Sequence, residues 1–162
     1  MYEWVVFLHV AGSFGFILAH GAAAAVIYAL RRERSPERVK ALLELSSSTV
    51  NVLYLALLTL LAGGVWAGFI GRFWGQGWIW LALGLLIAMA VAMFFIGTRH
   101  FGRLRQAVGL PFLEGGKVRD PRPPVSAAEL EVLLKQGQPH LLTVIGFGGW
   151  LLVLWLMMFK PF

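Results

Sequence analysis

The sequence contains no cysteine. Disulfide bonds, cysteine-held iron–sulfur clusters and thiolate metal sites are therefore excluded. The HExxH pattern of zinc peptidases and the glycine-rich phosphate loop are also missing, and no nucleophilic side chain stands in a recognisable pattern with a base. No catalytic residue is therefore predicted, and histidine and methionine are left as the side chains that could hold a metal or a haem.

Charged residues are scarce as well. They make up 14% of the chain, whereas a soluble domain has roughly 25%. Apolar and aromatic residues make up 59% of the chain. A water-soluble fold of this length could not bury so much apolar surface, so the composition predicts an integral membrane protein.

The charges that are present are mostly basic and give a formal net charge of +6. In a soluble protein this excess would suggest nucleic-acid binding. Here the basic residues flank long apolar blocks, where such residues orient a membrane protein and contact anionic lipid. We therefore predict a lipid bilayer with anionic headgroups as partner, and no nucleic acid.

The apolar residues fall into four blocks that are long enough to cross a membrane, which takes about 20 residues as a helix. None of the four has an Asp, Glu, Lys or Arg in its middle. Backbone groups in lipid must bond within their own segment, which favours helices. We predict an all-α, four-transmembrane-helix bundle that forms a single transmembrane domain over residues 1–162, with spans at about residues 4–30, 49–70, 78–98 and 140–159. The first block lacks the flanking signals of a cleaved signal peptide, so we expect it to be retained.

The distribution of Lys and Arg predicts the orientation. The connections 31–48 and 99–139 carry twelve of these residues, and the opposite side carries only Arg72 and Lys160. By the positive-inside rule both connections are cytoplasmic and both termini lie outside. Most tryptophans fall near the outer ends of the spans, as expected for an aromatic belt. The predicted location is a bacterial inner membrane, crossed several times.

Short signals organise the connections. Ser35 and Pro36 predict the start of a helix that continues into the second span, and Ser126 begins a capping box for a short helix ending near Gln136. The third helix is expected to continue to about Val108, and residues 115–124 are interpreted as a Pro/Gly-rich linker.

Two histidines of the first span, His9 and His20, are the strongest candidate ligands. They are eleven residues apart, which places both on one helix face at about 16 Å along the axis. Small residues such as Gly12 share this face and leave room for a flat ligand. Ionisable side chains within a membrane are costly and often functional. The alternative for His9 is a hydrogen bond to a neighbouring helix.

The other two histidines, His100 and His140, lie at the inner ends of the third and fourth spans. Each could join His20 as a haem ligand, or could simply be an interfacial residue. In the other pairing, His9 is one ligand and a methionine opposite it is the second (Met89, Met157 or Met158), since a b-type haem takes His or Met from helices. Arg99, with its neighbour Arg103, could bind the haem propionates. Copper held by His9 and His20 with methionine is the alternative cofactor.

The first span also carries a family resemblance. The stretch Phe7–Gly12 (FLHVAG), followed by small residues and then Arg31 and Arg32, resembles an uncharacterised bacterial family of four-helix predicted integral membrane proteins. More distantly it is similar to CopD-type copper-resistance proteins and to HemJ-type membrane proteins. The latter resemblance implies haem binding or porphyrinogen oxidation, with His9 as the matching histidine.

We therefore predict a b-type haem-binding electron-transfer subunit that exchanges electrons with another membrane redox subunit or with quinone. Two alternatives stay open at this point. The protein could be a non-catalytic accessory subunit of a larger membrane complex, or a copper-handling membrane protein.

Overall fold

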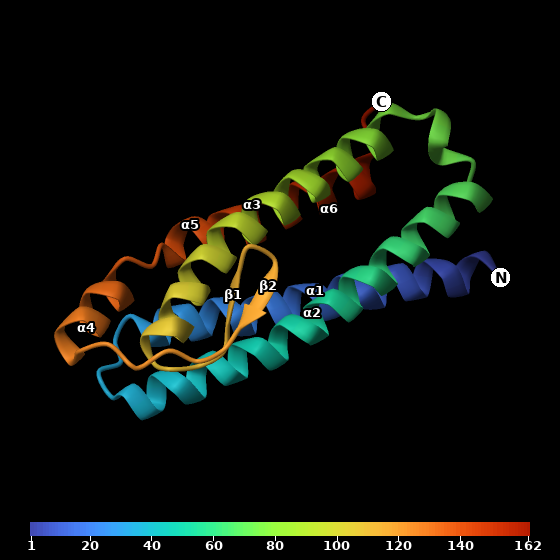
Figure 1. Cartoon of the computed structure of the whole chain (residues 1–162). Helices are drawn as coiled ribbons and strands as arrows, with labels where there is room; N and C mark the ends of the chain where they lie inside the picture. Colours follow the sequence, from blue (N-terminus) through green and yellow to red (C-terminus); the bar gives the residue numbers. More distant parts are fainter.

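The computed structural model describes residues 1–162 as an elongated bundle of long helices (Figure 1). The elements, in chain order, are α1 (Tyr2–Leu30), α2 (Pro36–Ile70), the 3₁₀ turn η1 (Phe73–Gly75), α3 (Gly77–Ala107), β1 (Phe112–Glu114), β2 (Lys117–Arg119), α4 (Ala127–Lys135), α5 (Pro139–Thr143), the π-helical segment η2 (Val144–Gly148) and α6 (Gly149–Phe159). The last three follow one another without a break and form the fourth long rod. The all-α architecture is as predicted, apart from one small hairpin.

Four helical segments are long and apolar enough to cross a membrane. Their outward surfaces are strongly apolar: Leu18 is 72% exposed and Ile87 is 62% exposed. Water would oppose such a surface, whereas lipid tails accept it, because burial in the protein is not needed when the solvent is itself apolar. The protein is therefore a multi-pass membrane protein in contact with the lipid bilayer.

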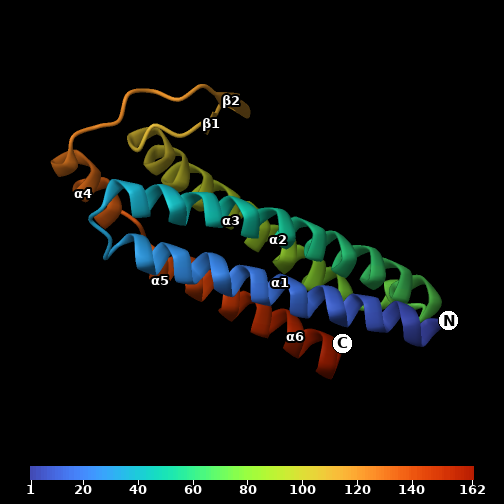
Figure 2. The same ribbon diagram turned by 90° about the horizontal axis from the view of Figure 1, so that it is seen from below.

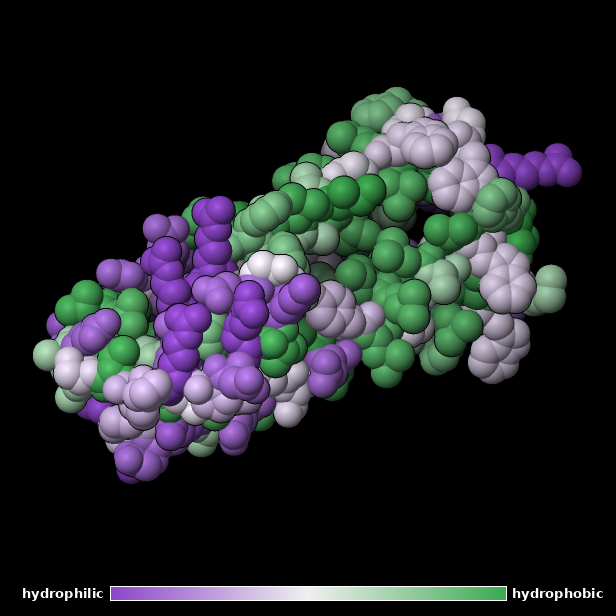
Figure 3. All heavy atoms as spheres, viewed as in Figure 1, coloured by the Kyte–Doolittle hydropathy of each residue, from purple (hydrophilic) through white to green (hydrophobic).

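The two ends of the bundle differ in chemistry. Both termini lie at one end (Figure 2), which we call the terminal end. The connection between α1 and α2 and the segment from β1 to α4 lie at the other, where hydrophilic side chains gather (Figure 3). We call this the basic end, and the positive-inside prediction makes it cytoplasmic.

The predicted helix starts at the basic end are confirmed. Ser35 precedes Pro36, and its side chain accepts a hydrogen bond from the backbone N–H of Arg38. The Ser126 side chain likewise accepts from the backbone N–H of Glu129. Each cap satisfies one of the free N–H groups at a helix start. The first cap begins a helix of 35 residues that continues unbroken into the second span.

The predicted linker at residues 115–124 differs from the structure in its first part. Gly115 and Gly116 have positive φ angles of 60° and 76°, as a tight hairpin turn requires. They join β1 to β2 in an antiparallel pair in which Phe112 lies opposite Arg119. The hairpin is anchored because the Phe112 side chain, 4% exposed, packs at the inner end of α3.

The best-packed part of the protein lies at the basic end. There the ends of α1, α2, α3 and α4 meet in one apolar cluster, whose buried members are Val26, Leu30, Val39, Leu43, Leu104, Ala107, Val108, Leu130 and Leu134. A smaller cluster joins α3 to α6 at the terminal end and contains Trp78, Ile79, Ala82 and Leu156. Neither cluster fills the middle of the bundle, and the candidate site lies between them.

Candidate functional site

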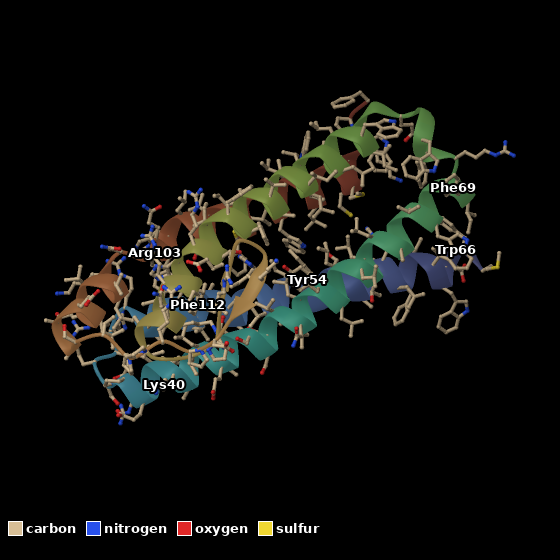
Figure 4. The ribbon with its side chains drawn as sticks, viewed as in Figure 1. Lys40, Tyr54, Trp66, Phe69, Arg103 and Phe112 are labelled. Atoms are coloured by element: carbon tan, nitrogen blue, oxygen red, sulfur yellow. The ribbon has the colours of Figure 1, made fainter.

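A cavity of about 520 Å³ lies in the middle of the bundle, between α2 and α3, with α1 as its floor. The surface is hollowed there in the space-filling view (Figure 3). Tyr54 of α2 lines the cavity and is labelled beside the gap in Figure 4, and Phe94 of α3 lines the facing wall. These two side chains are 56% and 50% exposed, so the cavity is open toward the lipid between the two helices.

The walls of the cavity are mainly aliphatic and aromatic, with a few polar groups. The polar side chains on its lining are His20, Ser46, Ser47, Asn51, Tyr54, Thr98 and Arg105. Sites for cofactors and other small molecules have this character, with apolar walls, few polar groups and volumes of roughly 300–1,000 Å³. The cavity therefore suits a large, mostly apolar ligand.

His20 is the histidine that lines this cavity. Its ring lies against Phe16, parallel at 6.4 Å between centroids, and against the edge of Phe147 at 5.1 Å. The Nε2 atom is buried and has no hydrogen-bond partner in the protein. Leaving a buried nitrogen unpaired costs about 1–3 kcal/mol. Nε1 of Trp74 is also buried and unpaired, but Trp74 does not line the cavity, so His20 is the residue whose free nitrogen could serve a ligand there.

The fourth span makes room for the His20 ring. Nε2 packs directly on Gly146, where a Cβ atom would collide with the imidazole. Gly146 belongs to η2, the π-helical segment in the middle of the span. Such segments widen a helix locally and are frequent at functional sites. A second glycine, Gly149, receives the sulfur of Met89 in the same way.

Two methionines of α3, Met89 and Met93, line the cavity together with His20. Met89 is almost fully buried, with 9% exposure. A thioether is a soft ligand that can bind haem iron or cuprous copper. The structure therefore brings His20 and two methionines to one cavity, whereas the sequence prediction placed Met89 opposite His9.

Arg105 stands at the basic end of the cavity. Its Nη1 donates hydrogen bonds to the Ser47 hydroxyl at 2.9 Å and to the Leu43 carbonyl at 3.5 Å, and its Nε donates to the Pro111 carbonyl at 2.6 Å. These bonds tie α3 to α2 at the point where the two helices begin to separate. A fixed guanidinium at the end of an apolar cavity suits a ligand with an acidic group.

His9 has a different environment from His20, although both lie on one stripe of α1. Its Nδ1 donates to the Leu60 carbonyl of α2 at 2.8 Å, with the tautomer assigned from this bond. The ring lies against Gly64, where an added Cβ atom would come within 2.8 Å of Nδ1, and the His9 backbone lies against Gly63, where a Cβ would come within 2.7 Å of the backbone nitrogen. The environment of His9 is that of the interhelical hydrogen bond named as the alternative to ligation.

The remaining histidines lie apart from the cavity. The ring of His100 packs against Gly137, between α4 and α5. Nδ1 of His140 is hydrogen-bonded to the Tyr28 hydroxyl at 3.0 Å, at an exposed position. Neither lines the cavity beside His20, so the pairings of His20 with His100 or His140 are not formed in this structure.

The arginine on the cavity differs from those named by the sequence. Arg99 and Arg103 are both exposed on α3 and do not line the cavity; Arg103 is labelled in Figure 4. The residue that does line it is Arg105. Helical phase separates these three arginines. Arg105 falls two turns after Thr98, so the two side chains lie on the same face of α3, and both line the cavity.

No three His, Asp or Glu side chains lie close enough together to share a metal ion. Comparison with known proteins finds no matching family model, no similar curated protein and no similar solved structure. The resemblance of the first span to the four-helix, CopD-type and HemJ-type families therefore stays a prediction. The candidate site rests on the geometry of the cavity alone.

Proposed function

We propose that this membrane protein is a b-type haem-binding electron-transfer subunit, with the haem in the cavity between α1, α2 and α3. The observation that carries the proposal is His20, which lines a cavity of about 520 Å³ and whose buried Nε2 atom has no hydrogen-bond partner. An imidazole nitrogen without a hydrogen bond keeps its lone pair available, and haem iron is bound by such a nitrogen.

The apolar lining of the cavity and the methionines on it also support the proposal. Haem is flat and mostly apolar, and the lining is predominantly apolar and lies between two separated helices. Met89 and Met93 line the same cavity from α3. The Met89 sulfur packs on Gly149, so Met93 is the methionine that could more directly supply a second ligand. In the structure Nε2 faces Gly146, so binding requires the His20 side chain to turn a ring nitrogen toward the cavity.

Bound haem would supply one-electron redox chemistry, whereas the protein supplies binding and orientation. The open side of the cavity faces lipid, which fits exchange with a membrane-dissolved quinone or an adjacent redox subunit. The predicted setting is a bacterial inner membrane, with the basic end in the cytoplasm.

Absorption spectroscopy tests the proposal. The detergent-purified protein, as isolated and after addition of haem b, is recorded in the oxidised state and after dithionite reduction. We expect a Soret band that sharpens on binding and shifts on reduction in the wild type. The His20→Ala variant is expected to lose this response.

The matched control is His140→Ala, which removes an exposed imidazole that lies outside the cavity. It should keep the spectrum of the wild type. A wild-type protein that stays colourless and gives no shifted Soret band with added haem would contradict the proposal and favour an accessory role in a larger complex.

A further inference from the structure

The basic end of the cavity carries a cation that has no acidic partner. The ion pairs of the protein join Arg34, Arg38, Arg119, Arg122 and Lys135 to nearby glutamates. Arg105 is in none of these pairs, although its side chain is partly buried. Arg31 and Lys40 are also half-buried and outside these ion pairs, but Arg105 is the one of the three that lines the cavity. Charged groups away from water are normally paired, so a ligand at this position could supply the missing counter-ion.

The hydrogen bonds of Arg105 leave part of its guanidinium free. Nε and Nη1 donate to two backbone carbonyls and to the Ser47 hydroxyl, and no hydrogen bond within the protein uses Nη2. A guanidinium has five donors in a fixed plane, and those on Nη2 can form charge-assisted hydrogen bonds to a carboxylate. The protein contacts therefore fix the plane of the group and leave donors for a ligand.

The position of Arg105 joins two hollows. It lines the main cavity and also a smaller hollow of about 270 Å³ under the β1–β2 hairpin. Thr98 and Phe101 line both spaces as well. An acidic group bound at Arg105 would thus lie at the boundary between the apolar interior and the basic end, which is the natural place for the polar head of an otherwise apolar molecule.

We propose that Arg105 is the residue that binds the acidic group of the cavity's ligand and orients it, with its carboxylates toward the basic end. The inference rests on the proposed function, in which the ligand is haem b and the acidic groups are its propionates. Arg99 and Arg103 are exposed and do not line the cavity, so they do not take this role.

The test compares haem b with haem b dimethyl ester, in which both carboxylates are blocked. Each is titrated into the detergent-solubilised protein and followed by the Soret absorbance. Wild-type protein is expected to bind haem b about tenfold more tightly than the diester, since charge-assisted hydrogen bonds to a carboxylate are strong. Arg105→Gln should lose that preference by weakening haem b binding to the level of the diester.

Two further variants serve as controls for the loss of preference expected in Arg105→Gln. Arg103→Gln, two residues away on α3 and outside the cavity, should keep the wild-type preference. Arg105→Lys keeps the charge without the planar fork and should give an intermediate preference. The comparison of the two porphyrins on wild-type protein needs no substitution and is therefore independent of any folding defect.

The outcomes separate this inference from the proposed function. Equal affinity of the wild type for haem b and its diester, or a preference that survives in Arg105→Gln, would overturn the role of Arg105 and leave haem binding intact. If neither porphyrin gives a shifted Soret band with the wild type, both proposals fall.

Discussion

The contact of α2 with α1 differs sharply from its contact with α3. The chain connects α2 to α3 as directly as it connects α1 to α2, yet α1 packs closely on α2 whereas α3 stands away from it around a cavity. The close contact depends on glycines: a Cβ on Gly12 would lie 2.5 Å from the Leu60 backbone nitrogen. On the open side, a Cβ on Gly97, which lines the cavity, would meet no atom within 4 Å.

The difference shows that van der Waals contact, and not connectivity, decides which membrane helices pack together. Lipid tails compete equally for apolar side chains, so helices associate where small residues let their backbones approach. The face of α3 toward α2 carries larger side chains such as Met93 and Phe94. At Gly97 on the same face an added Cβ would meet no atom within 4 Å, so a space remains between the two helices that is available for a ligand.

The largest expected loss of stability comes from breaking the close contact between α1 and α2. In Gly12→Val the new side chain meets backbone atoms of Leu60 and the Ala56 carbonyl, which cannot move without separating the helices. We expect a loss of about 3 kcal/mol or more in the free energy of unfolding, measured by unfolding in mixed detergent–SDS micelles. Gly84→Val, at a position with no neighbour within 4 Å, is the control and should change stability little.

A smaller loss of stability is expected at Gly146, where a neighbouring side chain can move away from the new atom. In Gly146→Ala the Cβ meets the His20 ring, which borders the cavity and can move into it. We expect a loss of about 1–2 kcal/mol in the same unfolding assay. Gly148→Ala, also in η2 but without neighbours, provides the baseline. A loss as large as that of Gly12→Val would mean that the space beside His20 is not free.

The hydrogen bond of His9 across the α1–α2 contact should contribute still less to the free energy of unfolding. His9→Leu removes the bond to the Leu60 carbonyl, and such bonds between membrane helices contribute about 0.6 kcal/mol on average and rarely more than about 1.7. The comparison variant is Thr59→Val, whose hydroxyl bonds only to Leu55 of its own helix. If His9→Leu also abolished the haem Soret shift, His9 would be a ligand and not a packing residue.

The smallest effect on stability is expected from filling the cavity. Ala90→Phe places a ring into space that is already empty, so the free energy of unfolding should change by less than about 1 kcal/mol. Haem binding should nevertheless be lost in the Soret titration, because the ring occupies the ligand's volume. Ala88→Phe, on the same helix but not on the cavity lining, should bind haem as the wild type does.

Much of the fold could be predicted because the membrane imposes it. Long apolar blocks can only be helices in lipid, and caps at Ser35 and Ser126 act within a few residues, so the local sequence is sufficient for them. The β1–β2 hairpin was not predicted, because its strands have only three residues each. Their stability depends on the contact of Phe112 with α3, which no local pattern shows.

The candidate site was only partly accessible from the sequence. Helical spacing placed His9 and His20 on one face, but it could not show that α2 covers one and η2 the other. Gly64 and Gly68 have the GxxxG spacing that often marks one helix contact, but in the structure Gly64 lies against His9, whereas Gly68 receives the ring of Trp74 from η1. Arg105 was counted among the cytoplasmic cations; helical phase separates it from Arg103, but only the packed bundle shows that its face of α3 meets the cavity.

The sequence alone determined four apolar helical spans, their caps and the gathering of positive charge at one end. These features follow from the transfer of each segment between water and lipid, which is a property of the segment itself. Only the tertiary structure decided which helices touch, which histidine keeps an unpaired nitrogen and which arginine meets the cavity. Those outcomes depend on whether a side chain on one helix finds space on another, and that space is defined only when the helices are packed.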